Sequence, residues 1–201
     1  MTPIATPTKS PPNLPKSHHA FLLVTAVIHD PGRGELVELE LDDGTRLRCT
    51  ASPEALRLGT ALSGRWRLTA HFRTRLNGSL VNPVKMVNLR LPRENDNETI
   101  WSASGQVVRL EQTSRLAVLR VYPERAKLEP FIVTAEASLE QLAHLENAYS
   151  VHMRGTLRGD VLVAQELERV ALTVPARWAT WKPTQARREV QDALEGQRDR
   201  T

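Results

Sequence analysis

The feature that most constrains the fold of this 201-residue sequence is an order of secondary-structure elements that occurs twice. Each half contains five segments of alternating apolar and polar residues, which predict β-strands, and one short segment that predicts a helix after the third strand. The dipeptide Thr-Ala precedes each predicted helix, at Thr50-Ala51 and at Thr134-Ala135, 84 residues further on. Self-similarity at such a domain-sized period indicates that one domain has been duplicated.

The predicted strands are separated by residues that favour turns, such as Asp43-Gly44 and Asn77-Gly78. The cluster from Asp30 to Gly34 is predicted to end the first strand. Ser52 is the candidate N-cap of the first helix, and Gly59 follows the end of that helix. The predicted strands are 21–28, 36–41, 45–50, 64–72 and 80–91, then 100–110, 115–122, 130–135, 149–157 and 161–172, with helices at 52–58 and 138–145.

This order of elements resembles the oligonucleotide/oligosaccharide-binding (OB) fold, a partly open Greek-key barrel of five strands. The chain is therefore expected to be all-β, with two consecutive OB-like barrels, a short helix between strands 3 and 4 of each, and a C-terminal helical tail. It is similar in this respect to the bacterial single-stranded DNA-binding proteins that have two OB domains per chain. A single β-sandwich of about ten strands is the alternative, but a helix at the same place in each half fits a sandwich poorly.

Charge and composition divide the chain into four parts. Residues 1–18 are rich in proline and are predicted to be a disordered leader. Residues 19–93 are the first barrel, and residues 1–93 hold 13 Lys+Arg against 7 Asp+Glu. Residues 94–172 are the acidic second barrel, with 8 against 12, and residues 173–201 are a tail with two tryptophans and a short helix. A basic half beside an acidic half indicates that a polyanion binds to the first.

The residue types that catalysis and metal binding require do not occur in suitable patterns. The six histidines lack the spacing of a metal site, and the single cysteine, Cys49, is predicted to be a buried core residue. His18 and His19 are expected to be solvated at the edge of the leader. We therefore predict that the chain is not an enzyme and has no catalytic residue, metal site or cofactor.

The localisation is predicted from the apolar segments. The sequence contains neither a stretch of about 20 apolar residues that could cross a membrane nor the apolar core of a signal peptide. We expect a soluble, cytoplasmic protein with no membrane association.

The candidate binding residues are polar side chains of the first barrel. From Arg65 to Arg73 every second residue is apolar, which predicts one face in the core and a cationic face toward solvent or ligand. The resemblance implies that a ligand lies across strands 2 and 3 and between the loops that join strands 1 to 2 and 4 to 5. Arginine suits phosphate because its planar fork donates two hydrogen bonds at once. The candidate nucleic-acid-binding residues are Arg33, Arg46, Arg48, Arg65, Arg67, Arg73, Arg75, Asn77 and Lys85.

Aromatic side chains are the second source of affinity for single strands, because bases stack on their rings. Four aromatics fall at apolar strand positions and are expected in the cores: Phe21, Trp66, Phe72 and Phe131. The candidate stacking residues are Trp101, Tyr122, Trp178 and Trp181.

Two functions from different classes fit these patterns. The first is a single-stranded nucleic-acid-binding protein, with DNA as the expected ligand, in replication, repair or recombination; the arginine face favours it. The second is a protein–protein interaction or scaffold module, which the low aromatic content and the acidic second barrel favour. A protein partner would bind the second barrel or residues 173–201, unless that tail docks back onto a barrel.

Overall fold

The computed structural model describes residues 17–33, 36–52, 64–94, 96, 98–123, 129–146 and 149–179. Most of the predicted leader, the helix at 52–58 beyond Ser52, Trp181 and the predicted C-terminal helix lie outside these residues. The described residues form ten strands and two short helices, which confirms the predicted all-β class. The elements are β1 (His19–Arg33), β2 (Leu36–Leu41), β3 (Arg46–Thr50), β4 (Arg65–His71), β5 (Val84–Arg90), β6 (Ile100–Glu111), β7 (Leu116–Val121), β8 (Phe131–Glu136), α2 (Leu139–Ala143), β9 (Ser150–Arg158), β10 (Val161–Arg169) and α3 (Ala176–Ala179).

The strands of each half pair in a closed circuit. In the first half β1 pairs with β2 and β4, β2 with β3, β4 with β5, and β3 with β5 in parallel. In the second half β6 pairs with β7 and β9, β7 with β8, β9 with β10, and β8 with β10 in parallel. Both circuits therefore run through their strands in the same order, first to second to third to fifth to fourth and back to the first.

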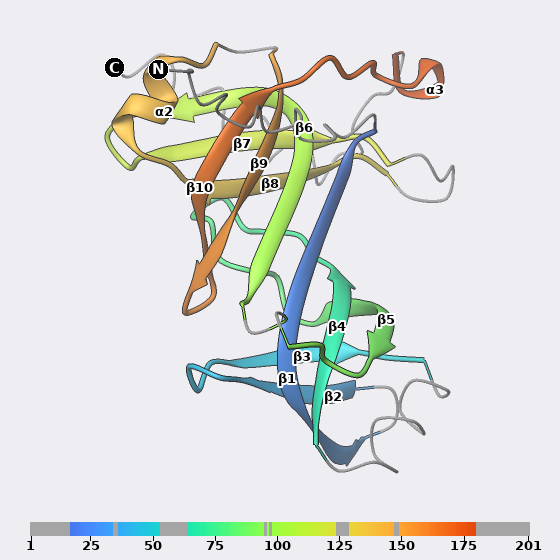
Figure 1. Ribbon diagram of the computed structural model, residues 1–201. Helices are drawn as coiled ribbons and strands as arrows, with labels where there is room; N and C mark the ends of the chain where they lie inside the picture. The colour runs from blue at the N-terminus through green and yellow to red at the C-terminus, as the bar shows by residue number, and fades with distance from the viewer. Residues whose placement is uncertain are drawn as a thin grey trace, which may run out of the picture.

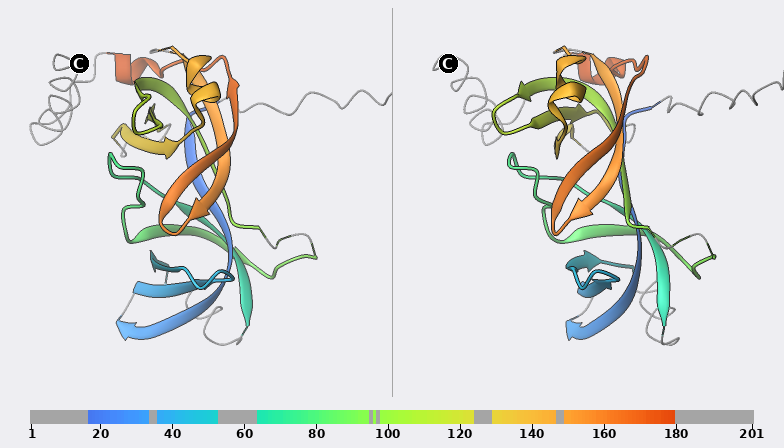
Figure 2. Two further views of the ribbon diagram at one scale, coloured as in Figure 1. Left: turned by 90° about the vertical axis from the view of Figure 1, so that its left-hand side faces the viewer. Right: turned by 60° about the vertical axis from the view of Figure 1, so that its left-hand side comes forward.

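The two circuits are joined because β1 also pairs with β6. This antiparallel pairing extends from His19 opposite Ser104 to Leu23 opposite Ile100. Figure 1 shows β1 running from the group of β2 to β5 at one end of the molecule toward the group of β7 to β10 at the other, and both views of Figure 2 show the same arrangement. All ten strands thus belong to one hydrogen-bonded sheet.

Two strand ends differ from the predictions. The turn predicted at Asp30 to Gly34 is wrong, because β1 continues to Arg33. Its register with β2 shifts between His29 and Arg33, and such an irregularity accommodates Pro31, which has no amide hydrogen for the ladder. The fifth strand begins at Val84 and not at Leu80, because residues 73–81 form a separate hairpin.

The core follows the two-residue period of the strands. In β2 and β3 every second residue is buried, and Cys49 has no exposed surface, as predicted. Burial raises the pKa of the Cys49 thiol to about 11. Trp66 and Phe72 are buried as predicted, whereas Phe21 and Phe131 are only half-buried. One cluster of buried apolar residues extends through both halves. Among the described residues no helix is long and apolar enough to cross a membrane.

The helix α2 lies between β8 and β9. Its N-terminus is a capping box, in which the Ser138 side chain accepts from the Gln141 amide and the Gln141 side chain accepts from the Ser138 amide. Leu142 is the buried residue of this helix and belongs to the buried apolar cluster.

Candidate nucleic-acid interface

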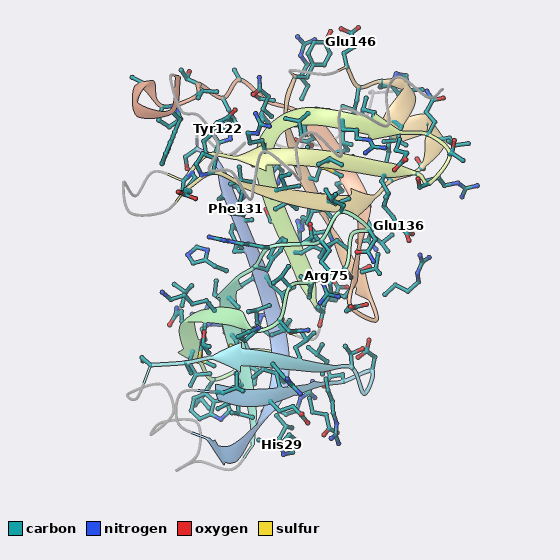
Figure 3. The ribbon with its side chains drawn as sticks, turned by 180° about the vertical axis from the view of Figure 1, so that it is seen from behind. His29, Arg75, Tyr122, Phe131, Glu136 and Glu146 are labelled. Atoms are coloured by element: carbon teal, nitrogen blue, oxygen red, sulfur yellow. The ribbon has the colours of Figure 1, made fainter. Side chains whose placement is uncertain are left out.

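The outer face of β2 and β3 carries as many carboxylates as guanidinium groups. Arg46 and Arg48 are exposed on β3, and their neighbours across the ladder on β2 are Glu40 and Glu38. Arg46 donates to Glu38 Oε1 at 3.1 Å and to Glu40 Oε2 at 3.3 Å. His29 Nε2 lies 3.1 Å from the same Glu40 oxygen; this residue is labelled at one end of the molecule in Figure 3. Exposed ion pairs of this kind add little stability, but they cancel local charge.

The polar face of β4 is divided between an exposed and a buried arginine. Arg65 is exposed and pairs with Asp42. Arg67, predicted to face solvent or ligand, is only 6% exposed, so that prediction is wrong. Its guanidinium donates to Thr25 Oγ1 at 3.2 Å, to the carbonyl of Asp96 at 3.1 Å and to the carbonyl of Glu98 at 2.6 Å. Asp96 and Glu98, between the two halves, thus lie against the outer face of β4.

Asp96 fixes this segment from its other side. Arg90 donates from both terminal nitrogens to the two Asp96 oxygens, one at 2.9 Å, and the Arg93 amide donates to Oδ2 at 2.7 Å. The hydrogen bonds from Arg90 and from the Arg93 amide lower the pKa of Asp96 to about 2. Asp96 is therefore ionised at neutral pH and holds Arg90 and Arg67 together.

The loop between β4 and β5 contains a hairpin of residues 73–81. The Val81 amide donates to the Arg73 carbonyl at 2.9 Å and the Arg75 amide to the Ser79 carbonyl at 2.8 Å. Asn77, a candidate ligand residue, accepts from the Ser79 amide and hydroxyl at 3.2 and 2.9 Å, so its side chain stabilises the turn. Gly78 has a φ of 85°, which favours glycine.

The 73–81 hairpin is bound to the second half. The Thr134 amide of β8 donates to Thr74 Oγ1 at 2.6 Å. The Leu80 amide donates to the Asp160 carbonyl at 2.8 Å, at the start of β10. The guanidinium of Arg73 lies 5.2 Å from the centre of the Phe131 ring. Figure 3 shows Arg75 in the middle of the molecule, between the strands of the two halves.

Three candidate cations lack a carboxylate partner within the described parts of the chain: Arg48, Arg75 and Lys85. Lys85 lies opposite Thr50 of β3 in the parallel pairing and opposite His71 of β4. Thr50 and Arg48 alternate with the buried Cys49, so Arg48 and Lys85 share the outer surface of β3 and β5. Arg33 belongs to β1, but its side chain lies outside the described residues.

The candidate stacking residues are mostly buried. Trp101 has no exposed surface, and its Nε1 donates to the Thr156 carbonyl at 2.9 Å. Tyr122 is 6% exposed, and its hydroxyl donates to Gln106 Oε1 at 3.1 Å. Both predictions of stacking are therefore wrong, because neither ring can reach a base. Trp178, in α3, is half-buried and donates to the Pro123 carbonyl at 3.0 Å, which joins this helix to the second half.

Histidines cluster where β1, β6 and β9 run side by side. His18 is 6% exposed and stands edge-on against Tyr122, so the prediction that it is solvated is wrong. His19 is half-buried, stacks on Phe21 and lies 3.0 Å from the Ser102 hydroxyl. Burial lowers the pKa of both histidines. Within the described ranges no group of three or more His, Cys, Asp or Glu residues could hold a metal ion.

The comparisons with known proteins give similarity to solved structures, but none to a family model or a curated sequence. The crystal structure of the wild-type single-stranded DNA binding protein from Thermus aquaticus is similar to this chain with 16% sequence identity and a TM-score of 0.44. The match covers 84% of this chain and 95% of that chain.

Proposed function

We propose that this chain binds single-stranded nucleic acid, and that its first half provides the binding surface. The proposal takes residues 19–93 and 94–172 as two OB-like barrels, because the strand circuits of the two halves have the same order. In the OB fold, ligands lie across strands 2 and 3 and between the loops joining strands 1 to 2 and 4 to 5. That surface includes β3 and the 73–81 hairpin in the first half.

The observation that carries the proposal is the set of exposed cations without a carboxylate partner among the described residues. These are Arg48 on β3, Lys85 on β5 and Arg75 on the hairpin. Phosphate can pair with such groups without first displacing a carboxylate, whereas Arg46 and Arg65 are already paired. Arg67 is buried and is not part of the proposed surface.

The proposed binding is mainly electrostatic. Because Trp101 and Tyr122 are buried, these two rings contribute no base stacking. Affinity that comes from phosphate contacts tolerates any base sequence and falls steeply with salt. Three such contacts would give a slope of about −2 when the logarithm of the binding constant is plotted against that of the salt concentration.

A salt-dependent titration of the full chain tests the proposal. A fluorescently labelled single-stranded oligonucleotide is titrated at several salt concentrations, and the anisotropy of the label is measured. We expect binding at micromolar protein that weakens as salt is added, with similar affinity for unrelated sequences. Absence of salt-sensitive binding at that concentration would reject the proposal.

Phosphate contacts do not distinguish DNA from RNA. We propose DNA as the ligand, for a cytoplasmic role in replication, repair or recombination, on the basis of the fold resemblance. Parallel titrations with DNA and RNA oligonucleotides of one sequence test this choice, and tighter binding of RNA would contradict it.

A protein-interaction module is the second candidate function. The observation that favours it is the equal number of carboxylates and guanidinium groups on the outer face of β2 and β3, where Glu38 and Glu40 both pair with Arg46. A partner would then bind the second half or residues 173–201. The same titration separates the two functions, because a scaffold without a nucleic-acid site shows no binding to the labelled strand.

A further inference from the structure

The 73–81 hairpin belongs to the first half by sequence but is held by the second half. The Thr74 hydroxyl accepts a hydrogen bond from the Thr134 amide on β8. Residues 78–80 run antiparallel to the start of β10. In that pairing the Leu162 amide donates to the Gly78 carbonyl at 3.3 Å and Ser79 bridges to Val161. A Cβ at Gly78 would lie 3.5 Å from Val161 Cγ1, in ordinary van der Waals contact, so the hairpin and β10 touch directly.

The two faces of this hairpin have different environments. Thr74 and Leu80, which form a bridge with each other, are 9% and 1% exposed. Arg73 and Arg75 alternate with Thr74 along the strand and are exposed. One face therefore packs on the second half, and the opposite face carries two exposed arginines, of which Arg73 also lies over the Phe131 ring of β8.

We propose that the second half positions the binding hairpin of the first half, so that Arg73 and Arg75 meet phosphate on a backbone that is already ordered. The inference rests on the proposed function. A loop that is ordered only on binding loses affinity, because the cost of ordering is subtracted from the contacts that it makes. Docking on β8 and β10 orders the hairpin during folding, so no free energy of binding is lost in ordering it.

Thr74 is the positioning residue of this arrangement. Its hydroxyl accepts a hydrogen bond from the amide of Thr134 on β8. Thr134 has no exposed surface, so this amide is buried. Removal of the hydroxyl leaves this amide without its partner and weakens docking. A variant without this hydroxyl still contains the guanidinium groups of Arg73 and Arg75. The number of phosphates that they can contact therefore does not change.

The test compares three variants of the full chain: Thr74→Val, Thr74→Ser and Arg75→Ala. Affinity for a labelled single-stranded DNA oligonucleotide is measured across a salt series, and amide hydrogen exchange is measured at Thr134, Leu80 and Leu162. For Thr74→Val we expect faster exchange at these amides and affinity lower by about tenfold, with an unchanged salt slope. Thr74→Ser keeps the acceptor and should bind like the unaltered chain. Arg75→Ala should reduce the slope by about 0.7, since one phosphate contact is lost.

Each result decides one point. Unchanged affinity of Thr74→Val, with faster exchange at Thr134, would overturn the positioning role and leave the proposed function standing. A reduced slope for Thr74→Val would also overturn it, because the residue would then act through a phosphate contact. Absence of binding by the unaltered chain would overturn the proposed function together with this inference. If Thr74→Val does not fold, Gly78→Ala strains the turn at a φ of 85° and should give the same lower affinity with unchanged slope.

Discussion

The guanidinium of Arg67 on β4 donates a hydrogen bond to the backbone carbonyl of Asp96, 3.1 Å away, in the segment that joins the two halves. A second hydrogen bond reaches the Glu98 carbonyl at 2.6 Å. The most buried arginine of the polar face of β4 therefore fixes the connection between the halves instead of meeting a ligand.

Replacement of Arg67 by alanine is expected to destabilise the fold. The variant loses several charge-assisted hydrogen bonds in a buried position, which lowers the free energy of unfolding by about 3 kcal/mol. Arg65→Ala is the matched control, because its exposed pair with Asp42 contributes about 0–1 kcal/mol. Denaturant unfolding of both variants measures the difference, and equal stability of the two would contradict this role of Arg67.

The same contacts predict resistance of the connecting segment to proteases. Residues 93–99 are all polar, but Arg67 and Arg90 hold Asp96 on the first half. Trypsin should therefore leave the bond after Arg93 intact under native conditions, since cleavage requires local opening. In Arg67→Ala this bond should be cut early, as fragment masses would show. Rapid cleavage there in the unaltered chain would mean that the segment is not held.

The low pKa of Asp96 predicts a loss of stability in acid. The pKa is about 2 in the folded chain, against an ordinary value of 3.8, so the ionised carboxylate stabilises the fold at and above that ordinary value. Because the folded pKa is the lower one, this contribution is lost as the pH falls from about 4 to about 2. Asp96→Asn should lower the Tm at pH 7, and the Tm difference from the unaltered chain should shrink toward pH 2. A difference independent of pH would contradict the assignment.

The strand order could be predicted from sequence because it depends on local signals. The two-residue period of burial and turn dipeptides such as Asp43-Gly44 placed most strands within a few residues of their observed ends. The hairpin at that turn also sets Glu40 opposite Arg46, so the neutral face of β2 and β3 could have been predicted from the register.

The other parts of the site depend on contacts between distant residues. Alternation showed which face Arg67 occupies, but not that the carbonyls of Asp96 and Glu98 lie over that face. Thr74 and Thr134 are 60 residues apart, and no local pattern indicates that the hairpin docks on β8. Trp101 is different, because it shares a face of β6 with the apolar Ala103, so its burial could have been predicted.

The measurement that tests the proposed surface most directly compares paired and unpaired cations in the full chain. Arg48→Ala and Lys85→Ala remove exposed cations that have no carboxylate partner among the described residues, and Arg46→Ala and Arg65→Ala remove cations that have one. Binding of a labelled single-stranded DNA oligonucleotide is measured across a salt series for all four. The account predicts that each of the first two weakens binding and reduces the salt slope by about 0.7, while the last two change the slope little. Equal effects in both pairs, or no salt-sensitive binding by the unaltered chain, would contradict it.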